Sequence, residues 1–205
     1  KEIYYLSGEN LRELKRDPRL ELFRKKGVEV LLLDDPVDAF VVPAIGNYKE
    51  KPLKSIESAD IDLKDDTPEA EESKLSGEPL EALLNVFRET AGERVEDVVV
   101  SKRLVESAVT LTVGASGMDS QMERMMKMMD PGLSAGPSKR VLEVNAGHPV
   151  IRNLSAMLQA GQTEQVGSLA RQLYEGALLL QGELESPAEF VQRMTRLMET
   201  ATSRG

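Results

Sequence analysis

Few residues of this 205-residue chain have the types and spacing that catalysis or ligand binding requires. His148 is the single histidine and cysteine is absent, so a Ser-His dyad, a thiolate metal site, cysteine catalysis and a disulfide framework lack their residues. Residues 114–117 are small and flexible but lack the lysine of a phosphate-binding loop. His148 precedes Pro149, where we expect a polar residue at a helix start. We therefore predict no catalytic residue, no bound cofactor and no metal site, and we do not expect this chain to be an enzyme.

Acidic residues are gathered in one part of the sequence. The formal net charge is −9, and residues 57–81 contain ten acidic side chains against Lys64 and Lys74. An acidic chain repels phosphate backbones, and no basic stripe with interleaved aromatic residues occurs, so we predict no nucleic-acid partner. No apolar run approaches the roughly 20 residues that span a bilayer, so we expect no contact with a membrane.

A small α/β unit is predicted for residues 1–63. It is the first of two units whose helices and strands would position any functional residues. Residues 3–6 form a short β-prone run, and apolar positions between 11 and 23 fit one or two short helices. Residues 28–33 form a near-continuous apolar strand, the pattern of a strand that is covered on both faces. A strand, a helix and a strand at this spacing imply a right-handed parallel crossover.

This unit is predicted to continue with a short helix and one more strand, and a linker follows it. The helix opens at Asp35 and carries Phe40, and residues 53–56 are predicted to form an edge strand. Residues 64–78 combine charges with Pro and Gly and are interpreted as an acidic linker.

Residues 79–205 are predicted to form a second, mixed α/β domain. The expected helices and strands are a helix from residue 80 that ends at Gly92, strands at 95–100, 109–113 and 141–144, and helices at 149–160, 164–181 and 187–201. The fold class is therefore α+β, with a small αβα subdomain followed by a second domain that ends in helices.

Several segments in order along nearly the whole chain match one known pattern. They are 1–8 (KEIYYLSG), 24–33 (RKKGVEVLLL), 35–38 (DPVD), 92–95 (GERV), 101–104 (SKRL) and 139–145 (KRVLEVN) followed by His148-Pro149-Val150. The last is the most specific, because a strand followed by Asn-x-x-His-Pro is uncommon by chance. With these segments the chain resembles the heat-shock protein 90 chaperone family of the bacterial HtpG type. The chain departs from the family pattern in its more acidic linker and in Pro43, which is expected to interrupt a helical segment.

The resemblance implies a fragment that covers the end of the middle domain and the C-terminal dimerisation domain of a cytoplasmic, ATP-dependent chaperone. Such a fragment forms a homodimer and contacts unfolded or partly folded client proteins. The ATPase part of the family lies upstream, so the resemblance implies ATP and magnesium only for the full-length parent.

Two groups of residues are candidates for client contact. Phe40 and Val41 occupy the place where the family contributes apolar client contacts, although ordinary packing of a short helix is equally expected. The second group is a stripe formed by Met118, Met122, Met125, Met126 and Met129. Such a stripe is usually core, but flexible sequence on both sides and the adaptability of Met favour exposure. The resemblance implies a helix that projects between protomers, and both interpretations stay open.

The last two predicted helices each carry an apolar stripe. The positions are Leu169, Leu173, Ala177 and Leu180 on the first helix, and Phe190, Met194, Leu197 and Met198 on the second. Packing within the chain is the simplest explanation, but two wide stripes exceed what one small sheet needs. We therefore predict a dimer interface in which these helices form a four-helix bundle between subunits.

Two other functions compete with the chaperone interpretation. One is a regulatory or small-molecule-binding domain of an enzyme that uses the turn at Ser7 and Gly8 as an anion site, which would require a ligand-sized pocket at the ends of the first two strands. The other is a structural adaptor without client contact. Exposure of the Met stripe would argue against the adaptor.

Overall fold

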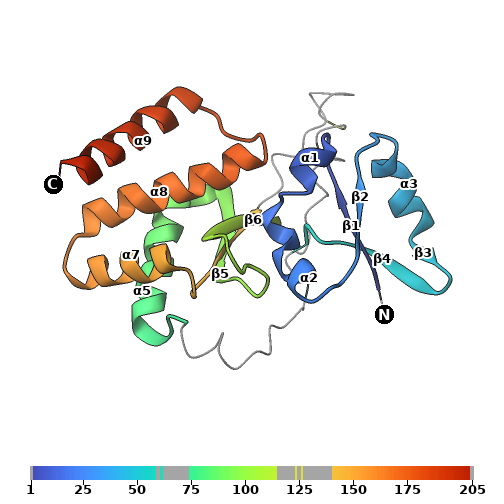
Figure 1. Cartoon of the computed structure of the whole chain (residues 1–205), viewed down its shortest axis with the longest axis horizontal. Coiled ribbons are helices and arrows are strands. Elements are labelled where there is room, and N and C mark those ends of the chain that lie inside the picture. Colours follow the sequence, from blue (N-terminus) through green and yellow to red (C-terminus); the bar gives the residue numbers. More distant parts are fainter. Residues whose placement is uncertain are drawn as a thin grey trace.

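The computed structural model describes residues 2–58, 61, 74–114, 123, 126 and 140–203, and these form two sheet-containing units that lie side by side (Figure 1). The first unit extends from β1 (Ile3–Ser7) to β4 (Lys51–Ser55), and the second from α5 (Gly77–Ala91) to α9 (Pro187–Thr202). Each unit combines helices with a mixed sheet, so the predicted α+β class is confirmed. None of the helices in the described ranges is long and apolar enough to cross a bilayer.

The first sheet has the strand order β2-β1-β4-β3. β1 pairs in parallel with both β2 (Val30–Leu33) and β4, and the short β3 (Asn47–Tyr48) pairs antiparallel with β4. The predicted parallel crossover from β1 to β2 is therefore present. The helical segments of this unit are α1 (Leu11–Leu14), η1 (Pro18–Leu20), α2 (Glu21–Lys25) and α3 (Asp38–Ile45).

Two predictions about this sheet are wrong. β2 is not covered on both faces, because Leu31 is 49% exposed and the other residues of the strand are only partly buried. β4 is not an edge strand, because β3 folds back onto it. The turn between them consists of Lys49 and Glu50, both with positive φ, which is the two-residue hairpin geometry that matches strand twist.

The expected interruption at Pro43 is also wrong. α3 continues through Pro43 to Ile45 and ends at Gly46, which has a φ of 61°. Proline removes one N–H, the one that would bond the carbonyl of Ala39. The next turn is still closed by the Gly46 N–H, which donates to the carbonyl of Val42 at 3.0 Å.

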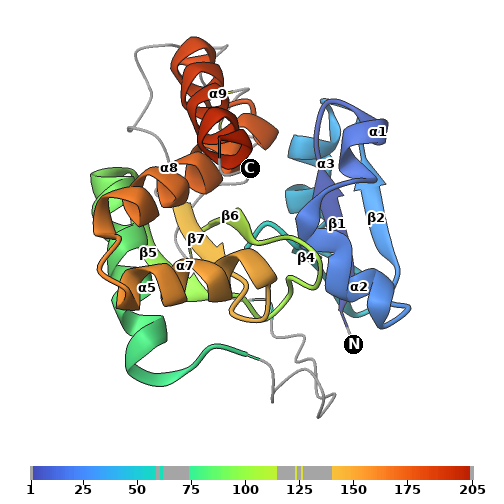
Figure 2. The same ribbon diagram turned by 60° about the vertical axis from the view of Figure 1, so that its left-hand side comes forward.

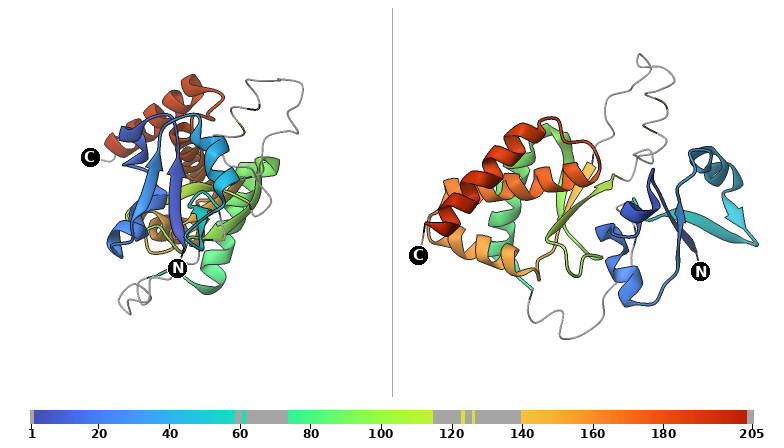
Figure 3. Two further views of the ribbon diagram at one scale, coloured as in Figure 1. Left: turned by 90° about the vertical axis from the view of Figure 1, so that its right-hand side faces the viewer. Right: turned by 45° about the horizontal axis from the view of Figure 1, so that its top comes forward.

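The second unit has the predicted elements in the predicted order. In its sheet the central β7 (Arg140–Val144) pairs in parallel with β5 (Val95–Val100) and antiparallel with β6 (Val109–Val113). The remaining elements are η2 (Gly92–Arg94), α7 (Pro149–Gln159) and α8 (Thr163–Leu180). Helices α5, α7 and α8 surround one side of the sheet (Figure 2) and share one apolar core with it, whereas α9 lies on the outside, alongside α8 (Figure 3).

The two faces of the second sheet differ in chemistry. Leu142 and Val144 of β7 point into the core beneath the helices. The opposite face carries Glu143 of β7 and Thr110 and Thr112 of the neighbouring β6, which are buried but polar. A buried polar face requires partners, and those of Glu143 are Ser101 and Arg103 from the loop between β5 and β6.

Candidate functional site

An exposed apolar surface lies on α3 of the first unit. The eight-residue helix buries only Ala39 and Val42, although its sequence is apolar almost all round. Phe40 and Val41 remain 43% and 41% exposed, and the exposed apolar side chains around them are Val37, Ile45 and Tyr48. We call these five residues the α3 patch. A cluster of large exposed apolar side chains typically marks a contact site for another protein.

Of the predicted Met stripe, only Met126 lies within the described residues. It is helical and 38% exposed. Met118, Met122, Met125 and Met129 lie outside the described residues, so their part in client contact stays a prediction. Glu123, three residues before Met126 in the sequence, is buried and forms an ion pair with Arg140 at 3.4 Å.

The predicted apolar stripe of α8 divides between core and surface. Leu169 and Leu173 are partly buried against the core of their own chain, and Ala177 is buried in it. Leu180 at the end of the helix is 72% exposed. Ala177 therefore has little surface left for a partner, whereas Leu180 has most of its side chain available.

None of the side chains of α9 is buried within the chain. Phe190, Met194 and Leu197 are partly covered, and Met198 is 56% exposed. Two exposed residues that the sequence interpretation missed lie in the same region, Leu179 and Val191. The run of three leucines at the end of α8 was a signal for Leu179, because three consecutive residues cannot all face one core.

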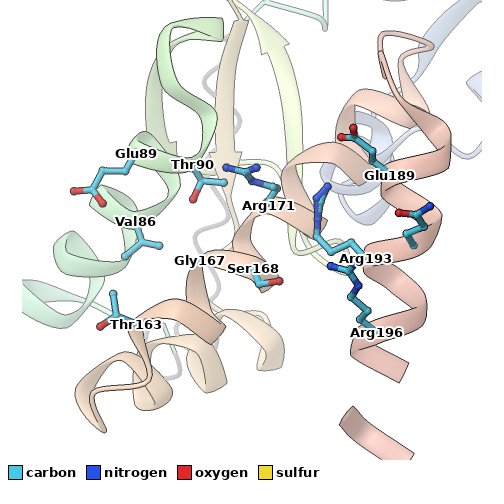
Figure 4. Close-up of a pocket in the computed structure, with 11 residues that line it drawn as sticks. Val86, Glu89, Thr90, Thr163, Gly167, Ser168, Arg171, Glu189, Arg193 and Arg196 are labelled. Carbon is cyan, nitrogen blue, oxygen red and sulfur yellow. The ribbon is translucent and has the colours of Figure 1, made fainter. Parts of the chain in front are cut away.

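A groove of about 670 Å³ opens between α5, α8 and α9. Its charged side chains are Glu89, Arg171, Glu189, Arg193 and Arg196, and the three arginines extend into it from α8 and α9 (Figure 4). Arg193 is already held by Glu175, with a 3.1 Å ion pair. Positive and negative charges therefore balance, and the groove lacks the net positive potential that would favour a polyanion.

The sites proposed for other chemistry serve local structure. His148 is the N-cap residue of α7, and its Nδ1 accepts a hydrogen bond from the Val150 N–H at 3.1 Å, as expected for a helix start. The Gly8 N–H donates to the carbonyl of Leu33 at 3.0 Å, so it is not available to an anion. Among the described residues, no group of three or more acidic or histidine side chains is arranged to hold a metal ion.

Sequence reasoning missed a set of buried charges where the two units meet. Arg103, in the loop between β5 and β6, is 1% exposed and pairs with Glu143 of β7 at 2.7 Å. Its guanidinium also donates to the carbonyls of Ile56 at 2.7 Å and Ser58 at 2.8 Å. Both carbonyls belong to the segment that leaves β4. Arg103 therefore ties the exit of the first unit to the polar face of the second sheet.

A second buried charge cluster lies within the first unit. Arg19 is buried and donates to Asp17 at 2.7 Å and to Glu57 at 2.8 Å. Burial raises the pKa of the Asp17 carboxyl, but the charge of Arg19 and the hydrogen bonds from it outweigh burial and hold this pKa below its ordinary value. Glu57 also accepts a bond at its backbone carbonyl from the Val113 N–H at 2.8 Å, so this cluster adjoins the junction.

Acid is expected to remove the contribution of Asp17 to stability. Because its folded-state pKa is depressed, the stabilisation is complete above the unfolded value of about 3.9 and is lost as pH falls through the folded value. Asp17→Asn should lower the free energy of unfolding by roughly 1.5–3 kcal/mol at pH 7, the usual range for a hydrogen bond to a charged group. Urea titrations at several pH values should show this difference shrinking below about pH 4. The exposed Asp34→Asn is the control, and an equal loss there would contradict the assignment.

Residues 1–204 match the protein family described as Hsp90 protein. The chain belongs to the Hsp90 family. Curated relatives named "Chaperone protein HtpG" include that of Chlorobium luteolum, 54% identical over 203 residues, which are 98% of this chain and 32% of the relative. That of Chlorobaculum tepidum is 49% identical over 203 residues, with the same coverage, and that of Psychrobacter cryohalolentis is 38% identical over 201 residues, 97% of this chain and 30% of the relative. This Hsp90 chain therefore spans about a third of the length of the curated relatives it matches.

Proposed function

We propose that this Hsp90 chain is the dimer-forming and client-contacting part of an ATP-dependent chaperone that assists protein folding. The family and the names of the curated relatives support the chaperone activity. Because the chain spans about a third of those relatives, ATP hydrolysis is assigned to the full-length protein, and this part contributes assembly and client contact.

One observation carries the proposal, which is the amount of apolar side chain left exposed on two separate elements. The α3 patch has no covering element within the described residues, and the end of α8 together with α9 leaves Leu180, Val191 and Met198 exposed. Burying such side chains against a partner is favourable at about 25 cal/mol per Å². A second copy is the partner that fits α9, because a two-fold interface brings identical faces together.

The α3 patch is suited to a client rather than to a fixed partner. Exposed apolar side chains on a short helix offer non-directional contacts, which many different unfolded segments can satisfy. The Met residues between 118 and 129 would add a flexible and polarisable apolar surface of the kind used by promiscuous binders.

If these residues contact clients, replacing them should weaken binding of unfolded client proteins and leave the fold of this chain intact. Replacing both Phe40 and Val41 by serine should weaken suppression of aggregation of a heat-unfolding client protein, and replacing Met122 and Met126 by serine should do the same. The physical reason is the removal of exposed apolar area. Light scattering at a fixed ratio of chain to client measures the effect.

The control is Val150→Ser, which removes an exposed apolar side chain of α7 outside both groups. Unchanged holding by both double variants would contradict client contact and favour a structural adaptor. A large drop in melting temperature for the Met variant would instead show that the stripe is core.

A further inference from the structure

A carboxylate of the first unit is bound by a loop of the second. Glu21 is the first residue of α2, and its Oε2 accepts hydrogen bonds from the N–H groups of Val105 at 2.7 Å and Glu106 at 2.8 Å. The Ser107 N–H donates to both carboxylate oxygens at 3.1 Å, and the Ser107 hydroxyl donates to Oε1. Three successive backbone N–H groups form an anion-binding concavity, and here the anion is a side chain of the same molecule.

The loop is preorganised for this carboxylate by Asn145 of the Asn-x-x-His-Pro motif. The Asn145 amide donates to the carbonyl of Ser107 at 3.0 Å, and its backbone N–H donates to the carbonyl of Ala108 at 2.8 Å. The Asn145 amide also donates to the carbonyl of Val105 at 3.4 Å, and this carbonyl is in the same peptide as the Glu106 N–H. Because the carbonyl and N–H of one peptide point in opposite directions, this bond directs the Glu106 N–H away from Asn145 and toward Glu21. Charge-assisted hydrogen bonds of this kind are roughly twice as strong as neutral ones.

The other cross-unit hydrogen bonds described above pass through a different segment. Arg103 binds the carbonyls of Ile56 and Ser58, and the Val113 N–H binds the carbonyl of Glu57. Residues 56–58 continue directly from β4, so these bonds act where the chain leaves the first unit. Without Glu21 the units would remain joined there, and they could turn about that segment.

We propose that Glu21 is a positioning residue that fixes the orientation of the first unit, and with it the α3 patch, relative to the second unit. Only the consequence for clients rests on the proposed function. That consequence is that a client long enough to span both units meets apolar surfaces at a fixed separation. The orientation itself is a property of the chain and can be measured without any client.

Spin labels test the orientation directly, because the chain has no cysteine and labelling sites can be chosen at will. Arg12→Cys on α1 and Asn153→Cys on α7 are both exposed positions. The labelled chain, diluted with unlabelled chain, should give one narrow inter-label distance distribution by pulsed electron paramagnetic resonance. Glu21→Ala should make it about twofold broader or shift its mean, because the lost contacts release a local orientation without global unfolding. Glu21→Gln, which keeps one acceptor oxygen, should give an intermediate width.

Glu13→Gln is the matched control, because Glu13 is an exposed glutamate on neighbouring α1. An unchanged distribution for Glu21→Ala overturns the proposal. Broadening that occurs only as the melting temperature is approached also overturns it, because Glu21 would then act through stability alone.

Client binding separates this proposal from the proposed function. Glu21→Ala should weaken holding of an unfolded protein long enough to span both units, and should leave binding of a short apolar peptide unchanged. If neither ligand binds the unmodified chain, the client proposal fails while the distance measurement still decides the role of Glu21. If both ligands bind the variant and the unmodified chain equally, the positional consequence for clients is wrong.

Discussion

Replacing Arg103 with leucine is expected to lower the free energy of unfolding by about 3–5 kcal/mol, the range measured when one partner of a buried ion pair is removed. Arg103 is 1% exposed, and its partner Glu143 is nearly as buried. Leucine would leave a buried carboxylate whose remaining described donor is the Ser101 hydroxyl at 2.7 Å. It would also leave the carbonyls of Ile56 and Ser58 without the guanidinium.

A double variant identifies the cause of this loss. Adding Glu143→Leu to Arg103→Leu removes the uncompensated charge, and the double variant should be more stable than Arg103→Leu alone. Recovery should be incomplete, because the two carbonyls of the first unit still lack their donor. Chemical denaturation of the two single variants and the double variant gives the coupling energy directly.

Arg94→Leu is the control for Arg103→Leu. Arg94 forms a 2.8 Å ion pair with Glu185 in which both side chains are more than half exposed. Exposed pairs contribute only about 0–1 kcal/mol. If Arg103→Leu lowers the free energy of unfolding by no more than Arg94→Leu does, the buried ion pair at the junction does not stabilise the chain as proposed.

The local periodicity of apolar residues was sufficient to predict the helices and strands of the second unit. A helix such as α5 has buried positions three and four residues apart, including Leu80, Leu83, Leu84 and Phe87, and a glycine beyond its end. Each of these signals lies within a few residues of the element that it defines. The strands and the three C-terminal helices were therefore predicted in the right order and nearly at the right bounds.

Strand neighbours in the first unit could not be predicted in the same way. The hairpin that covers β4 turns at Lys49 and Glu50, which are not the Asn-Gly or Asp-Gly pair expected for positive φ. Without that signal the two-residue β3 was not recognised, and β4 was placed at the edge. The error concerned a neighbour of the strand, not the strand itself.

The junction was beyond sequence reasoning for a different reason. Glu21 and Ser107 are 86 residues apart and have residue types that are ordinary on a surface. Arg103 was part of a segment recognised only as a family match. Charged residues give no local periodic signal that shows burial, so their role appears only when the partners are located in space.

The surface of α8 and α9 illustrates what periodicity leaves undecided. An apolar stripe shows that a face needs covering but not which surface covers it. Ala177 is covered by its own chain, whereas Leu180 on the same predicted stripe is exposed. The dimer interface therefore remains a prediction, and the structure only selects which of its residues are best placed to test it.

Met198→Asp is expected to convert the chain from dimer to monomer at micromolar concentration. A two-fold interface would place the new carboxylate on each side of the seam, so the substitution introduces desolvation and like-charge repulsion twice. Such repulsion costs several kcal/mol, which corresponds to a dissociation constant raised on the order of 100-fold or more. Leu180→Asp should act in the same direction.

Both positions are better tests than Leu197, which is partly covered within its own chain. A carboxylate at Leu197 would disturb the packing of α9 as well as the interface. Met198 and Leu180 are 56% and 72% exposed, so an aspartate at either position is solvated in the monomer and leaves the fold of the single chain intact.

Sedimentation equilibrium measures the mass, and circular dichroism confirms that each variant is folded. Gln192→Asp adds the same charge to another face of α9, among the side chains of the polar groove, and should remain dimeric. A monomeric mass for the unmodified chain would sink the proposed interface outright. An unchanged dimer in both Met198→Asp and Leu180→Asp would place the interface elsewhere, because a seam through these side chains cannot bury two carboxylates without a large loss of affinity.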